Sequence, residues 1–502
     1  MADVPSLIEE AARRREPDFT APSKIKNGGV DPLGLRETNF DLMNLLFPGI
    51  NNVAVHVRPF VVVAWAWRRA GQIVKESGAS TFPPEMMRDF VDRVEVIFSW
   101  SQFNRDPEVE LPGRVVLAPL RQSDSWHFGG DEWKKWRENR AGSTSLMAAI
   151  TYGPALKNLG WLMPLLENSS IYVPTERVAP ALDAFEEQLG DMLNHPAFSE
   201  FGAVDVYRSE VDAWAERWAI DRITEAEKRV MAEALFGAIA PEHRQSAGRL
   251  MREAVSYSGT TDPGAIRQTM AGHPSNFTPA EDLLVTANLW RSLQLRQLFR
   301  FALESLLYWI TLEIGNGSRT TDELVRALLD QAGIDGSVAS KSLKRWGQTK
   351  NAGPVELIDS IQTAINSGEP DRLVVEIFRG LGAIFAEVSA DQEVYGRPDR
   401  LPVVQACREF ASFHDQPTST FLRHIIESWI FAQHVYWSVG RGLGDARGRG
   451  KRLMRLKVIL EEGGWTLAPN VSSSSIPRPT ADRLRTAISL GTECGYLPAG
   501  PI

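Results

Sequence analysis

The sequence is poor in cysteine, with only Cys407 and Cys494 among its 502 residues. A structural zinc site built from thiolates needs three or four such ligands, so the count excludes it. A framework of disulfides is excluded as well, and so few cysteines suit a reducing compartment. We therefore expect a cytoplasmic protein.

Long apolar runs are also missing. The most apolar stretch, residues 59–67, is nine residues long, whereas a membrane-spanning helix needs about 20. It predicts a buried helix instead. The N-terminus carries Glu9 and Glu10 and lacks the apolar region of a signal peptide. We therefore expect no membrane partner.

An excess of positive charge is absent, because 55 Lys and Arg face 63 Asp and Glu, a formal net charge of −8. Any contact with nucleic acid must then come from a local patch. Hydrophobic residues make up 43% and charged residues 24%, values typical of a globular chain rather than a disordered one. The length allows about three or four domains.

The motifs of several enzyme classes are missing too. The sequence has no GxxxxGK(S/T) phosphate loop, no GxGxxG after a strand, no GxSxG elbow, no HExxH and no HxE followed by PCxxC. These absences exclude the ATPases, dinucleotide-binding enzymes, serine hydrolases, zinc proteases and deaminases that carry those motifs. Nucleases stay open, because their carboxylates are dispersed along the chain. No cofactor is predicted.

Helix signals dominate what is present. Three pairs fit a capping box, in which two side chains satisfy backbone N–H groups at a helix start: Ser6 with Glu9, Thr224 with Glu227, and Thr320 with Glu323. Apolar residues at helical spacing predict further helices. The longest is expected to begin at Pro279 and to lie in a core. The predicted helices cover residues 59–74, 83–101, 178–193, 279–314, 354–366, 371–388, 403–413 and 418–439.

Strand signals are sparse. Residues 114–118 predict a short strand, and residues 456–467, interrupted by Gly463 and Gly464, predict a hairpin. The expected fold is mainly α, a multidomain helical protein with a small C-terminal α+β module of winged-helix-like layout. The expected parts are an N-terminal arm (1–31), an N-terminal helical domain (32–173), a central helical domain (174–317), a small helical domain (318–400) and a C-terminal helix with the winged-helix-like module (401–502).

The predicted helix 418–439 carries His424, Glu427, Phe431 and His434 on one stripe. His424 and Glu427 are one turn apart and could share a metal ion, whereas His434 lies about 10 Å beyond Glu427 along the axis. The alternative, which we favour, is a polar stripe on an amphipathic helix.

A basic segment follows at residues 441–457, where seven basic residues face one acid, Asp445, and four glycines are interspersed. Such a segment can follow phosphates, whose contacts need charge but little fixed geometry. The alternative is a solvated surface loop. The candidate nucleic-acid-binding residues are Arg441, Arg447, Arg449, Lys451, Arg452, Arg455 and Lys457.

Two further groups of residues have a functional and a structural interpretation. Residues 126–136 hold three tryptophans, two acids and two lysines, which could form a base-stacking or metal loop. We favour a helix start, with Asp131 and Glu132 at the positive end of the helix dipole. Near the N-terminus, Phe47-Pro48-Gly49 predicts a tight turn, and Arg58 could pair with an acid or an anion.

These N-terminal residues also carry a resemblance. Leu46-Phe47-Pro48-Gly49, followed by Arg58 and a helix with Trp65 and Trp67, resembles the start of uncharacterised bacterial proteins encoded in phage-defence gene clusters. Tyr152-Gly153-Pro154-Ala155-Leu156 is similar to a second block in them. The resemblance covers about a tenth of the chain and implies other subunits, encoded by adjacent genes, as partners.

The sequence thus predicts a non-catalytic, DNA-engaging or scaffold subunit of a bacterial anti-phage defence assembly. One alternative is a metal-dependent nuclease that uses His424 and Glu427 with distant acids. A second alternative is a pure protein-interaction scaffold that does not bind DNA.

Overall fold

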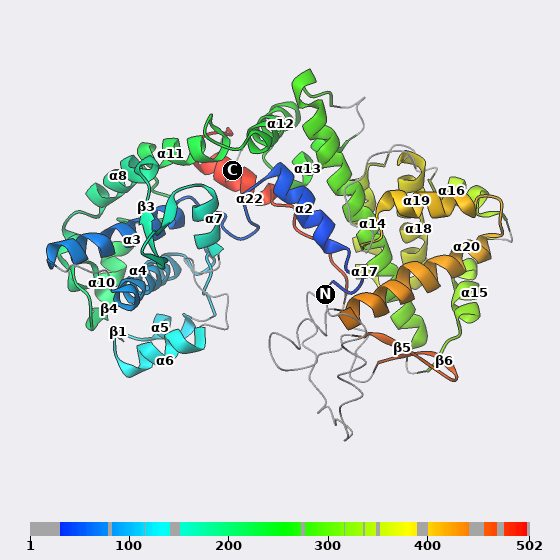
Figure 1. The fold of residues 1–502 in the computed structure, drawn as a ribbon, viewed down its shortest axis with the longest axis horizontal. Coiled ribbons are helices and arrows are strands. Elements are labelled where there is room, and N and C mark those ends of the chain that lie inside the picture. Colours follow the sequence, from blue (N-terminus) through cyan, green and yellow to red (C-terminus); the bar gives the residue numbers. More distant parts are fainter. Residues whose placement is uncertain are drawn as a thin grey trace. The chain divides into compact units, whose positions relative to one another are not determined.

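The structure is a computed structural model. It describes residues 31–78, 83–115, 117–140, 151–272, 277–315, 317–334, 337–347, 352–388, 400–440, 456–468 and 476–498. The chain is mainly α and forms two compact units (Figure 1). Unit 1 takes in the chain up to Leu42, Met270–Thr278 and Asn288–Thr480, and unit 2 takes in Met43–Thr269, Pro279–Ala287 and the chain from Ala481. The finer division into five parts stays a prediction.

Three helices, α2 (Arg36–Leu46), α13 (Pro263–Ala271) and α14 (Leu284–Ile314), have residues in both units. The other helices of unit 2 are α3 (Arg58–Glu76), α4 (Pro84–Arg105), α5 (Ala118–Gln122), α6 (Asp131–Arg140), α7 (Gly153–Asn158), α8 (Ala179–Leu189), α9 (Pro196–Ser199), α10 (Arg208–Ala215), α11 (Glu225–Phe236), α12 (Glu242–Ser258) and α22 (Leu484–Glu493).

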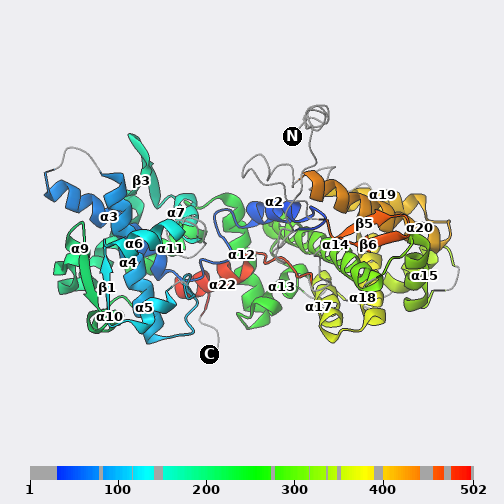
Figure 2. The same ribbon diagram turned by 90° about the horizontal axis from the view of Figure 1, so that it is seen from below.

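The centre of unit 2 is the pair α3 and α4, which pack against each other (Figure 2). Pro59 occupies the first turn of α3, where a missing N–H costs nothing. Every residue of α3 from Arg58 to Trp67 is buried, and the bounds of α3 confirm the helix predicted at residues 59–74. Aromatic rings of α3 and α8 meet edge to face, as Trp65 and Phe185 do at 5.7 Å between centroids.

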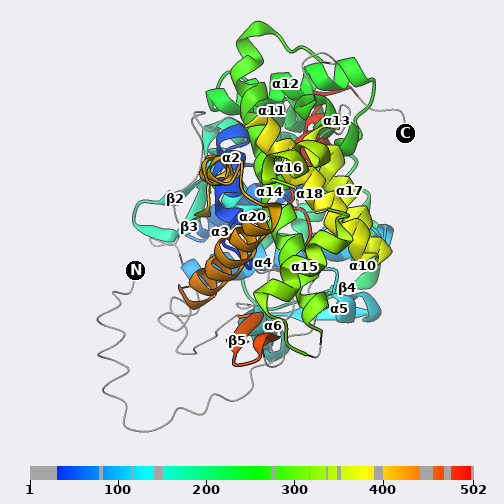
Figure 3. The ribbon, with the colours of Figure 1, turned by 90° about the vertical axis from the view of Figure 1, so that its right-hand side faces the viewer.

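Unit 1 is built on α14. Its other helices are α15 (Thr321–Gln331), α16 (Ala339–Gly347), α17 (Pro354–Ser367), α18 (Pro370–Glu387), α19 (Val403–Ser412) and α20 (Thr418–His424). A π-helical segment, Ile425–Ala432, continues α20. The core gathers buried side chains from α14, α15, α17, α18, α19 and α20, and both α16 and α17 pack against α18 (Figure 3).

The strands of the described residues form three two-stranded antiparallel sheets, none of them parallel. They are β1 (Ser125–Phe128) with β4 (Val204–Tyr207), β2 (Leu162–Leu165) with β3 (Asn168–Pro174), and β5 (Val458–Glu461) with β6 (Gly464–Leu467). The β5–β6 hairpin confirms the one predicted at residues 456–467. The winged-helix-like module is not confirmed, since the hairpin belongs to unit 1 and α22 to unit 2.

Two predictions about element limits are wrong. The described residues of the range 114–118 do not form a strand, because the Leu117 N–H closes a turn onto the Gly113 carbonyl, and α5 begins at Ala118. Gly113 has a φ of +96°, which only glycine adopts readily. The long helix begins at Leu284 instead of Pro279, after a short 3₁₀ turn at Glu281–Leu283.

Two of the three predicted capping boxes lie within the described residues. The capping boxes of Thr224 with Glu227 and of Thr320 with Glu323 are both confirmed by reciprocal hydrogen bonds. Ser6 and Glu9 lie outside the described residues. None of the described helices is both long and apolar enough to cross a membrane.

Glu227 has a second role beyond its capping box. One carboxylate oxygen lies 3.1 Å from Nη1 of Arg58, and both side chains are fully buried. Arg58 also donates to the Arg222 carbonyl and to Gln188 Oε1. Burial raises the pKa of Glu227 and lowers the pKa of Arg58, although each charge partly offsets the shift of the other. Desolvation therefore outweighs the attraction between the two charges. Removal of either side chain would leave the other charge buried without a partner.

We predict that Arg58→Ala lowers the free energy of unfolding by about 3–5 kcal/mol, because it leaves the Glu227 carboxylate buried without a counter-charge. The double variant Arg58→Met/Glu227→Gln should recover part of this loss, since no charge is then left buried. Urea unfolding followed by tryptophan fluorescence measures both changes.

The matched control is Arg88→Ala, which removes an exposed pair with Glu85 in the same unit. Its effect should be about 1 kcal/mol or less. Equal losses for Arg58→Ala and Arg88→Ala would show that the buried pair has no special structural role.

Candidate functional site

The basic segment is attached to unit 1 at both of its ends. Arg441, Arg447, Arg449, Lys451, Arg452 and Arg455 lie outside the described residues. The helix before them is described up to residue 440, and the chain resumes at Leu456 and Lys457. The backbone N–H of Lys457 donates to Nε2 of His434 at 2.8 Å, so one side chain ties the two ends together.

His434 is a buried structural residue. It is 0% exposed, and its second ring nitrogen, Nδ1, lies 2.8 Å from the Pro32 carbonyl oxygen. Because Nε2 accepts from Lys457, Nδ1 carries the proton and donates to Pro32. Burial lowers the pKa of His434 to about 4, and the positive charge of Lys457 acts in the same direction. The imidazole is therefore neutral at neutral pH and joins three distant parts of unit 1.

His424 lies in a different environment. Its Nε2 donates to Glu409 Oε2 at 2.8 Å, and Trp429 Nε1 donates to the same oxygen at 2.6 Å. These hydrogen bonds help to keep the pKa of Glu409 below its ordinary value, although burial opposes them. The π-helical segment begins directly after His424, and its wider turns change the spacing of the stripe expected from the sequence. Sequence spacing could not indicate Glu409 as the partner of His424, because Glu409 lies in another helix, α19.

Glu427 does not turn toward His424. Its carboxylate lies 3.4 Å from Nη1 of Arg423, one turn earlier on the exposed surface. Among the described residues, no three His, Cys, Asp or Glu side chains come together in a way that could hold a metal ion. The pair His424 and Glu427 is thus not completed by a third ligand within the described ranges.

Ser428 completes a chain of contacts with His424 and Glu409. Its hydroxyl lies 3.3 Å from His424 Nδ1, the nitrogen that is free to accept. An acyl-transfer site would also need N–H donors for a developing oxyanion. Ser428 lies within continuous helix, where neighbouring N–H groups bond to helix carbonyls. The three residues are therefore best explained as a polar staple between α19 and the helix that α20 begins.

The tryptophan-rich segment is structural in the described residues. Trp133 is buried, stacks on Trp136 at 5.1 Å and donates to Asp89 at 2.7 Å. Arg137 of the same helix pairs with Asp89 and Asp92. The segment thus fastens α6 to α4, as the helix-start interpretation predicts.

The N-terminal group is structural as well. Asp31 accepts from the Leu35 and Arg36 N–H groups and caps α2. Gly49 has a φ of +81°, as the predicted turn requires. The Pro48 carbonyl accepts from buried Arg244. Comparison of the chain with protein-family models, with curated proteins and with solved structures gave no match.

We predict that His434 makes the protein less stable in mild acid. The unfolded chain binds a proton near the ordinary pKa of 6.5, whereas the folded pKa is about 4. The contribution of neutral His434 to the free energy of unfolding is then fully present above about pH 6.5. It is lost as the pH falls toward about 4, and the loss is about 3 kcal/mol in all. Urea unfolding at stepped pH measures this slope.

His434→Gln should flatten this part of the pH dependence, because the group that titrates is gone. The control His414→Gln removes an exposed histidine that is 58% accessible and should leave the slope unchanged. An unchanged slope in His434→Gln would contradict the prediction.

Proposed function

We propose that this chain is a non-catalytic, DNA-engaging subunit of a bacterial anti-phage defence assembly, and that residues 441–457 contact the phosphate backbone. The observation that carries the proposal is the hydrogen bond between Lys457 and His434, which closes the basic segment at its base. The defence context rests on the resemblance of the N-terminal residues alone.

The two described ends of the basic segment lie close together. His434 lies six residues before the last described residue of its helix, a distance of about 9 Å at the rise of an α-helix. Between the two ends, residues 441–456 carry six basic side chains and one acid. Their net charge is +5, whereas the formal net charge of the whole chain is −8. The segment that carries these cations therefore leaves and rejoins unit 1 at two points that lie close together. Phosphates attract such a local excess even when the whole protein is acidic.

The contacts of the two candidate catalytic residues, His424 and Glu427, favour a binding role over a nuclease. His424 is engaged with Glu409, and Glu427 with Arg423. The nuclease remains testable. Incubation with plasmid DNA and Mg²⁺ or Mn²⁺ should give no cleavage, whereas cleavage that is lost in Glu427→Ala would favour the enzyme.

We predict steeply salt-dependent binding to a duplex of arbitrary sequence, measured by fluorescence anisotropy over a salt series. If five side chains each neutralise one phosphate, the plot of log K against log salt has a slope of about −4.5. Replacing Arg447, Arg449, Lys451, Arg452 and Arg455 by alanine should remove most of this slope and most of the affinity.

The matched control removes the same charge elsewhere on unit 1. The control replaces five exposed basic residues by alanine: Arg326, Lys341, Lys344, Arg345 and Arg372. This variant should keep most of the affinity. Equal losses in the two variants would reduce the effect to net charge. Absence of binding at low salt would favour the pure scaffold, which should co-purify with the products of adjacent genes.

A further inference from the structure

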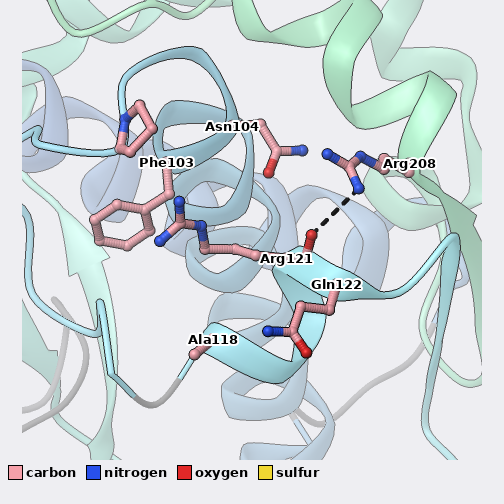
Figure 4. A pocket seen from close by; sticks show the side chains of 7 residues that line it. Phe103, Asn104, Ala118, Arg121, Gln122 and Arg208 are labelled. Atoms are coloured by element: carbon pink, nitrogen blue, oxygen red, sulfur yellow. Dashed lines mark hydrogen bonds between the residues drawn. The ribbon is translucent and has the colours of Figure 1, made fainter.

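A cavity of about 400 Å³ opens on unit 2, at the end of α4 (Figure 4). It is lined by Phe103, Asn104, Pro107, Ala118, Arg121, Gln122 and Arg208. Its volume falls within the range of about 300–1,000 Å³ that is usual for small-molecule sites. None of these residues belongs to the basic segment or to the helix that carries His424 and His434.

Local structure brings the three elements together. β1 pairs with β4, and the Arg208 N–H donates to the Asp124 carbonyl at 2.8 Å. The first residue of α10 is therefore held next to the end of α5. Arg208 Nη1 then donates to the carbonyl oxygen of Arg121 at 3.3 Å, the contact drawn in Figure 4. Two guanidinium groups from different elements thus border one cavity.

Arg121 is a cation that the described residues do not pair with an acid. No carboxylate among the described residues lies within ion-pair distance of it, and no described group accepts a hydrogen bond from its side chain. Its guanidinium lies over the ring of Phe103, 5.8 Å from the centroid. Stacking on an aromatic ring holds the group in place, while its N–H edge stays free to donate.

Arg208 is only weakly neutralised. Its Nε lies 3.9 Å from Asp212, whose other oxygen accepts from Asn104 at 2.8 Å. Arg208 is also the first residue of α10, where the helix dipole disfavours a cation. Helix stability therefore does not explain an arginine at this position. Asn104 keeps its amide oxygen to accept a hydrogen bond inside the cavity.

We propose that this cavity binds a small phosphate monoester, with Arg121 and Arg208 on the phosphate. Two planar guanidinium groups match the charge and the oxygen geometry of a phosphate dianion. The Asn104 amide oxygen accepts from a hydroxyl of the ligand. Pro107 and Ala118 contact its carbon skeleton.

Isothermal titration of the full chain with ribose 5-phosphate tests the proposal, with inorganic phosphate, ribose and citrate as comparison ligands. Ribose 5-phosphate should bind saturably, inorganic phosphate more weakly, and ribose not at all. Arg121→Ala and Arg208→Ala should each weaken binding about tenfold or more, because each removes charge-assisted hydrogen bonds. Arg121→Lys keeps the charge but loses the planar guanidinium with its paired N–H donors. Its affinity should lie between those of the wild type and Arg121→Ala.

Arg222→Ala, an exposed arginine of the same unit outside the cavity, should bind as the wild type does. The five-alanine variant of the basic segment should also bind normally, which separates this site from DNA binding. The proposal is overturned if ribose 5-phosphate does not bind, or if neither arginine variant weakens binding. Ribose or citrate binding as tightly as ribose 5-phosphate would overturn the assignment to phosphate monoesters.

Discussion

Buried arginines that donate to loop carbonyls are the interaction on which both units depend. Few strands are present, so many connections are irregular and their backbone carbonyls need donors from side chains. Arg244 donates to the carbonyl of Pro48 in a turn, and also to those of Ala234 and Leu235 in the last turn of α11. Arg93 donates to Gly202 at 2.8 Å. Burial lowers the pKa of both arginines to about 10, so they stay charged, and each connection is bound by a charge-assisted hydrogen bond.

The same device runs through α14. Arg296 donates to the Leu401 and Arg400 carbonyls, at 2.7 and 2.8 Å, and Arg300 donates to Arg478 while pairing with Glu304 at 2.6 Å. Burial raises the pKa of Glu304 and lowers that of Arg296 to about 9. A helix predicted to lie in a core therefore carries a polar seam, and distant stretches of unit 1 converge on it.

Sequence patterns predicted what depends on neighbouring residues. The two described capping boxes and the helix over residues 59–74 follow from spacing alone, and all three are confirmed. The strand at 114–118 failed because a turn at Gly113 outweighs the β propensity of two valines. The partners of His424 and Arg58 could not be predicted, since Glu409 and Glu227 are brought near only by tertiary packing.

This division also separates structural cations from candidate binding groups. An arginine that is buried and donates to backbone carbonyls, such as Arg244 or Arg296, contributes to stability, and its guanidinium lies out of reach of a ligand. Arg121 is different, because its charge is not matched within the described residues and it borders a cavity. The basic segment is a local excess of the same kind in sequence. An excess of positive charge is what an anionic ligand can recognise, and on this ground we propose partners that carry phosphate for both sites.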